Sequence, residues 1–384
     1  MAQLPSQDIL ALLEFKKGIK VDPTGYILNS WNEESIDFDG CPSSWNGIVC
    51  NGGNVAGVVL DNLNLVAEAN LSVFVNLTKL VKLSMSNNSI TGKIPSNIGG
   101  LGKLEYLDIS DNLFSSTIPP EIGKLVSLRN LSLAGNNFSG SLPDSIGGLA
   151  SIQSLDLSLN LLSGALPSSL TKLQNLVSLN LSCNGFTKEI PAGFEEIADL
   201  EVFDLHQNQL DGVIDEKFLL LASAVHVDLS SNLLSSSNSQ KRNFLVGFVG
   251  PVKHLNLSHN QFTGSLIGRG GGGLTSFENL KVLDLSYNQL SGELPGFEYF
   301  YALEVLRLSN NMFSGFVPDG LLKGGESLVL SELDLSANNL SGRSDNALVW
   351  DVLECVMKVF CFYNLACMHV EYSDECFVCC AVIQ

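Results

Sequence analysis

The stretch LRNLSLAGN, residues 128–136, decides the fold of this chain because it fits the pattern L-x-x-L-x-L-x-x-N. In an extended strand, successive side chains point to opposite sides. Leu131 and Leu133 therefore share one face, while Asn130 and Ser132 share the other. Each buried leucine stabilises the fold by roughly 1.5–3 kcal/mol relative to an exposed one. A strand this short cannot bury its leucines alone, so it must pack against other copies of itself.

The same pattern returns along most of the chain, which indicates about twelve repeats. The final asparagine stands every 24 residues from position 88 to position 232, and the later intervals are 28, 28, 23 and 27 residues. An earlier unit around Val58 and Leu60 has Leu63 where the asparagine would stand. We expect an α/β repeat solenoid in which each repeat adds one strand to a parallel sheet on the concave side. The ladder asparagines are Asn88, Asn112, Asn136, Asn160, Asn184, Asn208, Asn232, Asn260, Asn288, Asn311 and Asn338.

We expect the ladder asparagines to be structural. The chain turns sharply after each strand, which leaves backbone amide and carbonyl groups without partners. A carboxamide has both donors and an acceptor, so it can bond the turns of adjacent repeats. Because an unpaired buried polar group would cost about 1–3 kcal/mol, a column of asparagines holds the repeats together, and a catalytic role is not favoured.

A second motif follows the asparagine in several repeats. It reads FSGSLP at residues 138–143, LSGALP at residues 162–167 and LSGELP at residues 290–295. Glycine permits a tight turn, and proline ends the short extended stretch. This L-x-G-x-[IL]-P motif on a 24-residue period resembles the plant extracellular type of leucine-rich repeat. The resemblance implies the horseshoe or superhelical fold of that type.

Residues 1–53 precede the repeats, and we expect them to form an N-terminal cap. The stretch SQDILALLEFKKGI, which starts at Ser6, predicts an amphipathic helix. Cys41 and Cys50 are expected to form a disulfide in an oxidising compartment. A stapled cap of this kind would cover the apolar end of the solenoid. The predicted apolar side of the helix consists of Ile9, Leu12, Leu13 and Ile19.

The cap and repeats resemble the extracellular part of plant leucine-rich-repeat receptor-like kinases. The resemblance is carried by LPSQDILALLEFKKGIK and CPSSWNGIVCNGGNVAGVVLDN in and after the cap, and by NLTKLVKLSMSNNS and NLKVLDLSYNQLSGELPGF in the repeats. It extends from Gln3 to about Gly342. The family includes membrane pseudokinases of guard cells, so the resemblance implies a role in abscisic acid and reactive-oxygen signalling. It also implies a location at the extracellular face of the plasma membrane or in the apoplast.

The chain departs from this family after Gly342. The family continues with more repeats, a membrane span and a kinase-like domain, whereas the repeat pattern stops here. The glycine-loop lysine, H-R-D and D-F-G motifs of a kinase do not occur in the sequence. The N-terminus lacks the basic start and apolar run of a signal peptide. We therefore expect a truncated, non-catalytic form.

Residues 343–384 form a divergent, Cys-rich tail with three open interpretations. One is a membrane span over residues 348–370, whose three charged residues would cost up to roughly 2.5–3.5 kcal/mol each near mid-membrane. Another is a metal site that includes Cys376, Cys379 and Cys380, although their spacing does not suit zinc. We favour the third interpretation, a non-native or disordered tail.

Charge and glycosylation sequons narrow the range of partners. The 21 Lys and Arg residues against 40 Asp and Glu residues give a net charge of −19, which disfavours nucleic acids and anionic lipids. Asn-x-Ser/Thr sequons favour an extracellular location. The candidate glycosylation sites are Asn70, Asn76, Asn87, Asn130, Asn137, Asn180, Asn256 and Asn339.

Six aspartates occupy the middle of the L-x-L step and should form one row on the concave side. They could bind a basic peptide or a cation. We favour the interpretation that aspartate is simply the consensus residue of such repeats at this position. Carboxylate pairs on strands about 4.8 Å apart could hydrolyse glycosides, yet nothing tunes one acid against another. Asn180 and Asn256 share this row and Asn130 shares the strand face, so glycans there would shield part of the concave side. The aspartates are Asp108, Asp156, Asp204, Asp228, Asp284 and Asp334.

Three other features have a functional and a structural interpretation. Cys183 precedes a ladder asparagine without a nearby partner, and we favour a serine-like consensus position over a redox-sensitive thiol. Residues 235–251 and 268–273 interrupt the repeats and are expected to be protruding loops that can contact a partner. The second loop, GRGGGG, lacks the lysine and the setting of a phosphate loop.

We expect a binding protein rather than an enzyme, with no cofactor and no metal ion. The concave face and an edge of the solenoid would recognise an extracellular peptide, a wall component or the ectodomain of a co-receptor. The alternative function is a secreted inhibitor of a cell-wall-degrading enzyme. Such an inhibitor would carry a Cys-stapled C-terminal cap, which is not recognisable in this sequence.

Overall fold

The computed structural model describes residues 6–32, 40–214, 221–236, 251–266, 278–297, 300–318, 321 and 330–341. The chain divides into two compact units, Met1–Leu210 and Asp211–Gln384. Within the described ranges, no helix is long and apolar enough to cross a membrane. The tail, with its candidate span and cysteine cluster, lies outside these ranges, as do the glycine-rich loop and residues 237–250.

The cap begins with helix α1 (Gln7–Lys16). Its N-cap is Ser6, whose side chain accepts a hydrogen bond from the backbone N–H of Ile9 at 3.3 Å. Asp8 lies in the first turn and Lys16 in the last, and both charges suit the helix dipole. The buried side of the helix consists of Ile9, Ala11, Leu12 and Phe15.

The predicted apolar side of this helix was wrong at two positions. Leu13 is half-buried, and Ile19 lies beyond the helix in strand β1 (Ile19–Val21). Phe15 belongs to the buried side because its ring lies 5.0 Å from the ring of Phe74. Between helix and strand, a Cβ atom on Gly18 would come within 2.3 Å of the carbonyl oxygen of Glu68, so the close approach of the two backbones requires glycine there.

The cap and the first repeat share one core. Cys41 and Cys50 form the predicted disulfide. Nearby, the buried rings of Trp31 and Trp45 stack at a centroid distance of 5.6 Å. The carboxylate of Asp8 accepts a hydrogen bond from the backbone N–H of Val55 at 2.8 Å, which ties the helix to the sheet. The cap therefore covers the apolar end of the repeats, as a solenoid requires.

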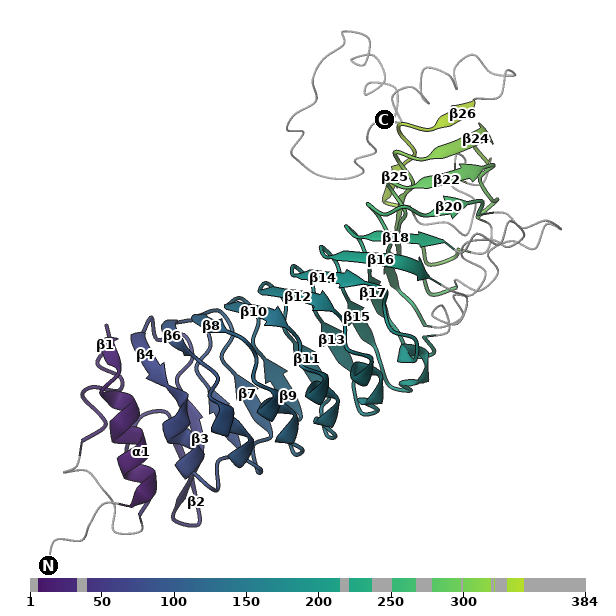
Figure 1. Ribbon diagram of the computed structural model, residues 1–384. Coiled ribbons are helices and arrows are strands. Elements are labelled where there is room, and N and C mark those ends of the chain that lie inside the picture. The colour runs from purple at the N-terminus through teal and green to yellow at the C-terminus, as the bar shows by residue number, and fades with distance from the viewer. Residues whose placement is uncertain are drawn as a thin grey trace, which may run out of the picture. The chain divides into compact units, whose positions relative to one another are not determined.

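The first unit contains a sheet to which each repeat adds one short strand (Figure 1). The strands from β3 onward are parallel, and their leucines align from strand to strand, as Leu131 does with Leu107 and Leu155. The predicted solenoid with a parallel sheet is confirmed. The strands are β2 (Ile48–Asn51), β3 (Asn54–Val59), β5 (Lys82–Ser84), β7 (Tyr106–Asp108), β9 (Asn130–Ser132), β11 (Ser154–Asp156), β13 (Ser178–Asn180) and β15 (Val202–Asp204).

The second unit contains five strands of the same kind, again parallel and in register. Their spacing in the sequence is irregular, but each of them keeps the two apolar residues of the step buried, Val227 and Leu229 in β17 and two leucines in the other four. The extra residues therefore lie outside the strands. These strands are β17 (His226–Asp228), β19 (His254–Asn256), β21 (Val282–Asp284), β23 (Val305–Arg307) and β25 (Glu332–Asp334).

The motif after each ladder asparagine, and the matching stretch after Leu63 in the earliest repeat, forms additional strands, which the sequence indicated only as a short extended stretch. In the first unit they pair with one another in a second sheet. They are β4 (Val66–Asn70), β6 (Ser89–Lys93), β8 (Leu113–Ser116), β10 (Asn137–Ser141), β12 (Leu161–Ala165), β14 (Gly185–Lys188) and β16 (Gln209–Ile214), and in the second unit β18 (Leu233–Ser236), β20 (Thr263–Gly264), β22 (Gln289–Gly292), β24 (Met312–Phe316) and β26 (Asn339–Ser341).

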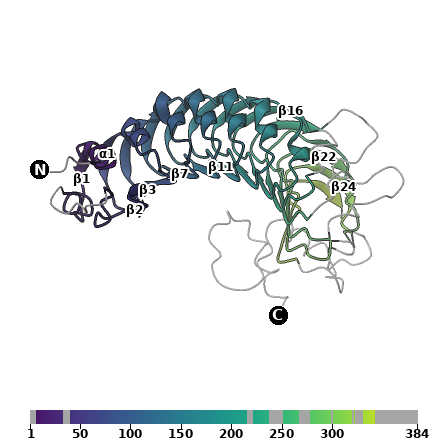
Figure 2. The ribbon, with the colours of Figure 1, turned by 90° about the horizontal axis from the view of Figure 1, so that it is seen from below.

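Short 3-10 helices follow these strands in the first unit. They lie on the side opposite to the sheet that contains β3, β7 and β11 (Figure 2). Each 3-10 helix turns the chain back toward the next strand and buries an apolar residue such as Ile122 or Ile146. They are η2 (Leu71–Asn76), η3 (Ser96–Gly100), η4 (Pro120–Lys124), η5 (Asp144–Gly148), η6 (Ser168–Lys172) and η7 (Phe194–Glu196).

The ladder asparagines bond adjacent repeats to each other, as Asn160 illustrates. Its Nδ2 donates to the carbonyl of Leu133 in the preceding repeat at 2.9 Å and to the carbonyls of Leu157 and Ser158 in its own repeat. Its Oδ1 accepts from the backbone N–H of Phe138 at 3.0 Å. Asn160 is 7% exposed, so these bonds satisfy polar groups that have little access to water.

Candidate binding face

The outward side of strands β5 to β15 and β17 to β25 is here called the concave face, and two rows of side chains line it. The aspartate row contains the middle residue of each L-x-L step, and the upstream row contains the residue two positions earlier. Residues two apart on a strand share a face, so the rows run side by side. Sequence reasoning identified the aspartate row but missed the upstream row, although its position two residues before each aspartate could have revealed it.

Within each unit, register aligns the members of a row on neighbouring strands. In the first unit, the upstream row is Lys82, Tyr106, Asn130, Ser154, Ser178 and Val202, and the aspartate row is Ser84, Asp108, Ser132, Asp156, Asn180 and Asp204. In the second unit, the upstream row is His226, His254, Val282, Val305 and Glu332, and the aspartate row is Asp228, Asn256, Asp284, Arg307 and Asp334.

The aspartates have a local structural task. Asp156 Oδ1 accepts hydrogen bonds from the backbone N–H of Ser158 at 3.0 Å and from its hydroxyl at 2.7 Å. The same pair of bonds recurs at Asp108, Asp228, Asp284 and Asp334. Asn180 and Asn256 replace the carboxylate in two repeats and make the same contacts. These bonds support the consensus interpretation of the row.

In the first unit, a cation and an aromatic ring meet on the concave face. The ammonium of Lys82 lies 4.4 Å from the centre of the Tyr106 ring, a cation–π geometry. The hydroxyl of Tyr106 donates to Asp108 Oδ2 at 3.2 Å. Burial and the charges of Asp108 and Asp61 raise the pKa of Tyr106 to about 12. The phenol therefore stays neutral and can donate a hydrogen bond at any physiological pH.

In the second unit, Arg307 pairs with two carboxylates on the concave face. Arg307 donates from Nε to Glu332 Oε1 at 2.6 Å and from a terminal nitrogen to Glu332 Oε2 at 2.9 Å. Its other terminal nitrogen lies 3.4 Å from Asp284 Oδ2. The hydrogen bond to Glu332 is the main cause that raises the pKa of Arg307 above its ordinary value. This bidentate pair fixes the guanidinium on the face.

Two histidines lie side by side at one end of these rows. The rings of His226 and His254 stack with centroids 4.5 Å apart. Burial, followed by the neighbouring His226, lowers the pKa of His254 below its ordinary value. The neutral imidazole therefore predominates at His254 near pH 7.

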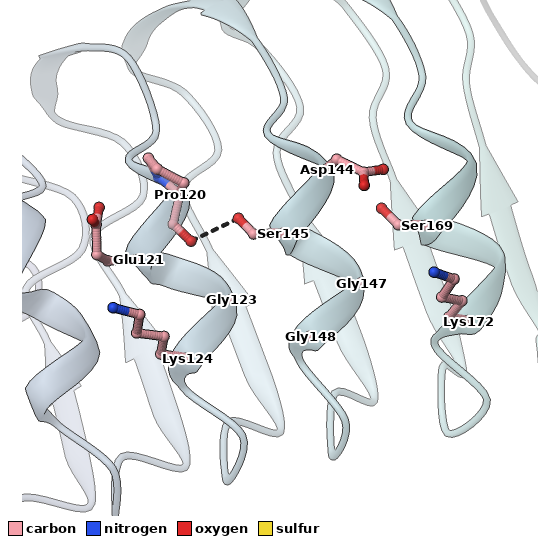
Figure 3. Close-up of a pocket in the computed structure, with 10 residues that line it drawn as sticks. All are labelled: Pro120, Glu121, Gly123, Lys124, Asp144, Ser145, Gly147, Gly148, Ser169 and Lys172. Carbon is pink, nitrogen blue, oxygen red and sulfur yellow. Dashed lines mark hydrogen bonds between the residues drawn. The ribbon is translucent and has the colours of Figure 1, made fainter.

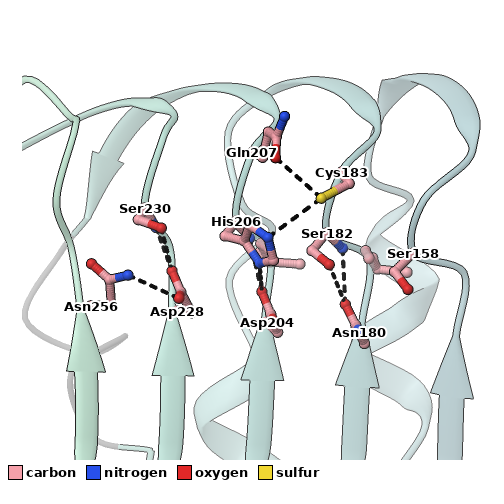
Figure 4. A network of polar contacts seen from close by, with 12 residues as sticks. Ser158, Asn180, Ser182, Cys183, Asp204, His206, Gln207, Asp228, Ser230 and Asn256 are labelled. Carbon is pink, nitrogen blue, oxygen red and sulfur yellow. Dashed lines mark hydrogen bonds and ion pairs between the residues drawn. The ribbon is translucent and has the colours of Figure 1, made fainter. Parts of the chain in front are cut away.

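Cys183 has polar neighbours that the sequence did not indicate (Figure 4). Its Sγ lies 3.4 Å from His206 Nε2 and 3.3 Å from Gln207 Oε1, and His206 Nδ1 lies 2.8 Å from Asp204 Oδ1. The expectation that Cys183 lacks a nearby partner was therefore wrong. Burial is the main cause that raises the pKa of this thiol, so the cluster does not produce a thiolate nucleophile.

A shallow groove lies on the side of the 3-10 helices, between η4, η5 and η6 (Figure 3). The hydroxyl of Ser145 donates to the carbonyl of Pro120 at 2.6 Å across it. Its charged side chains alternate in sign along the helices, from Glu121 and Lys124 to Asp144 and Lys172. This groove resembles the space between successive turns of any repeat rather than an enclosed ligand site.

The candidate glycosylation sites differ in exposure. The half-buried group consists of Asn130, Asn180 and Asn256 on the concave face, and the exposed group consists of Asn70, Asn76, Asn87, Asn137 and Asn339. Asn256 Nδ2 also donates to Asp228 Oδ2 at 3.0 Å, so a glycan on that nitrogen would compete with this bond. Shielding of the concave face by glycans stays a prediction.

Sequence profiles match most of the described chain. The profile described as "Leucine rich repeat N-terminal domain" matches residues 5–51, and the "Leucine-rich repeat region" matches residues 116–217. The "Leucine Rich Repeat" profile matches residues 79–101, 103–125, 251–269, 279–297 and 302–323.

Two relatives from Arabidopsis thaliana illustrate the similarity in sequence. The LRR receptor-like serine/threonine-protein kinase GHR1 is 66% identical over 342 residues, which are 89% of this chain and 32% of the relative. Pollen receptor-like kinase 1 is 35% identical over 112 residues, which are 29% of this chain and 16% of the relative. The chain thus spans about a third of the length of GHR1.

Solved structures of plant receptors have the same fold. The ectodomain of the Arabidopsis receptor kinase HAESA, in complex with an N-terminally extended IDA peptide hormone, matches with a TM-score of 0.72 and 32% identity, covering 87% of this chain and 53% of that one. The PEPR1–AtPEP1 complex matches with a TM-score of 0.73 and 29% identity, covering 87% and 49%. The chain therefore belongs to the leucine-rich-repeat family, with a cap and repeats of the kind found in plant receptor-like kinases.

Proposed function

We propose that this chain is a receptor-type ectodomain whose concave face binds an extracellular peptide or the ectodomain of a co-receptor. The observation that carries the proposal is the pair of aligned, half-buried rows along the parallel strands. Support comes from HAESA and PEPR1, which have the same fold and are described in complex with the peptides IDA and AtPEP1.

The chemistry of the rows suits an extended peptide. In the first unit, Asn130, Ser154 and Ser178 offer amide and hydroxyl groups at successive strands, which can bond the backbone of a peptide laid across them. In the aspartate row, Asp156 Oδ1 accepts the hydrogen bonds of its local turn, so its Oδ2 remains available to a ligand on the concave face. Together with the net charge of −19, this favours a peptide with basic residues.

A variant pair tests this assignment. Peptides selected from a phage-displayed library against the full chain are measured by biolayer interferometry. Ser154→Arg combined with Ser178→Arg introduces two long cations into the upstream row, and we expect binding to weaken by about tenfold or more. The matched control is Ser168→Arg combined with Gln174→Arg, two exposed positions at and beside η6 that add the same charge. Equal losses in both pairs, or unchanged binding in the first pair, would contradict the proposal.

We further propose that the chain acts at the extracellular face of the plasma membrane or in the apoplast, in responses to abscisic acid and reactive oxygen. The similarity to GHR1 supports this proposal. On the same similarity, we propose that the receptor continues with a membrane span. Plants in which the encoding gene is disrupted should close their stomata less in abscisic acid and in hydrogen peroxide. Stomatal apertures equal to those of unmodified plants would exclude the role.

A further inference from the structure

Two neighbouring strands of the second unit place three metal-ligating side chains together on the concave face. His226 and Asp228 are two residues apart on β17, so both point to the same side of the sheet. His254 on β19 lies opposite His226 in the register of the parallel pair. The two imidazole rings stack at a centroid distance of 4.5 Å. The arrangement depends on the alignment of residues 28 positions apart.

One ligand atom from each of these residues lies within 4.8 Å of the others. Bonds of about 2.0–2.1 Å to a tetrahedral zinc ion place its ligand atoms about 3.4 Å apart, so side-chain rotation suffices to close the cluster around an ion. All three side chains are half-buried and can be reached from solvent. We propose that His226, Asp228 and His254 form a site for one late first-row transition-metal ion, with Zn²⁺ as the expected occupant.

The donor set decides the class of metal. Two imidazole nitrogens and one carboxylate oxygen suit Zn²⁺ and Cu²⁺, whereas Ca²⁺ and Mg²⁺ require a shell of oxygen ligands. The acidic chain attracts cations in general, but a general attraction would not select this point on the face. The proposal is independent of peptide binding by the concave face and assigns a further binding site to it.

The carboxylate of Asp228 is held in place before any ion arrives. Its Oδ1 accepts from the backbone N–H of Ser230 at 2.9 Å and from the Ser230 hydroxyl at 2.6 Å. Its Oδ2 accepts from Asn256 Nδ2 at 3.0 Å and retains a second lone pair for a metal (Figure 4). Hydrogen bonds of this kind orient metal ligands, and their loss commonly weakens metal binding by about 10–100-fold.

Within this unit, one neighbouring carboxylate is already paired with a cation. Asp284, the next carboxylate along the aspartate row within this unit, is paired with Arg307, which in turn binds Glu332. Asp284 is therefore engaged elsewhere. A tetrahedral ion on His226, Asp228 and His254 would keep one position for water or for a group of a bound partner.

Zinc binding to the full chain tests the proposal with isosteric variants. Asp228→Asn should fold, because Asn256 makes the same contacts with Ser258 in the next repeat. In isothermal titration with ZnCl₂, we expect Asp228→Asn and His254→Gln each to weaken one binding event by about tenfold or more. The control is His259→Gln, an exposed histidine that stacks on Tyr287 outside the cluster, and it should bind as the parent does.

Cobalt distinguishes this site from the cysteines of the tail. Co²⁺ bound by nitrogen and oxygen ligands gives d–d absorption without a thiolate charge-transfer band, and this signal should disappear in Asp228→Asn and His254→Gln while circular dichroism stays unchanged. Equal stoichiometry and affinity in the parent and both variants would overturn the proposal. A parent that binds the metal only through sulfur would overturn it as well.

Discussion

The carboxamide of Asn160 contacts four backbone groups from two repeats, with three carbonyls at its nitrogen and one N–H at its oxygen. The same arrangement recurs along the ladder, for example at Asn136 and Asn288. Aspartate has the same shape but no donor, and its charge would face carbonyl oxygens in a buried site. The chemistry of the ladder therefore depends on the amide nitrogen.

Replacing Asn160 by aspartate should lower the free energy of unfolding by about 3 kcal/mol or more, because several buried carbonyls lose their donor. Urea denaturation followed by circular dichroism measures this loss. Asn137→Asp, at an exposed residue of β10, is the matched control and should change stability by at most about 0.5 kcal/mol. If both variants unfold at the same urea concentration, the structural role of the ladder nitrogen is disproved.

Other residue-scale features were beyond the reach of the sequence. The residue before each ladder asparagine has a left-handed backbone, including Leu159 with φ 54° and Cys183 with φ 53°. Asparagine, aspartate and glycine tolerate this conformation and occupy it in four repeats, but leucine, cysteine and tyrosine occupy it in others. Because the side chains differ so much, the common conformation is set by the turn and the ladder, not by local preference.

At the scale of elements, the sequence predicted the strands well and their partners partly. The L-x-L step places Leu131 and Leu133 in the interior, and both are completely buried. The 24-residue period then fixes the parallel register of the first unit. The second sheet was missed as a sheet, because strands such as β10 and β12 acquire hydrogen-bond partners only when the repeats stack.

Contacts between elements explain why the candidate metal site was missed. His226 and His254 are 28 residues apart, in a region where the period of the repeats is irregular. Arg307 and Glu332 are likewise brought together by the pairing of β23 with β25. The sequence places each residue at the correct step of its own repeat, but side-chain neighbours across strands require the register, which insertions hide.

For the molecule as a whole, the contacts of each repeat with its neighbours determine how stability is distributed. Asn160 bonds its own turn and the preceding repeat, and β11 pairs with β9 and β13. Stability in such an array is close to a sum of repeat and interface contributions. A local defect should therefore open nearby repeats more than distant ones.

Hydrogen exchange monitored by mass spectrometry can follow this spread in the Asn160→Asp variant. We expect faster exchange in the amides of β9, β11 and β13, an effect that decreases toward β3, and unchanged exchange in α1 of the cap. The reason is that the variant removes bonds between two adjacent repeats. Helix α1 is held by other contacts, the hydrogen bond from the Val55 N–H to Asp8 and the packing of the Phe15 ring on the Phe74 ring. The parent chain in the same buffer is the reference. A uniform acceleration from α1 to β15 would show that the first unit opens as one cooperative block, and the nearest-neighbour description would then be wrong.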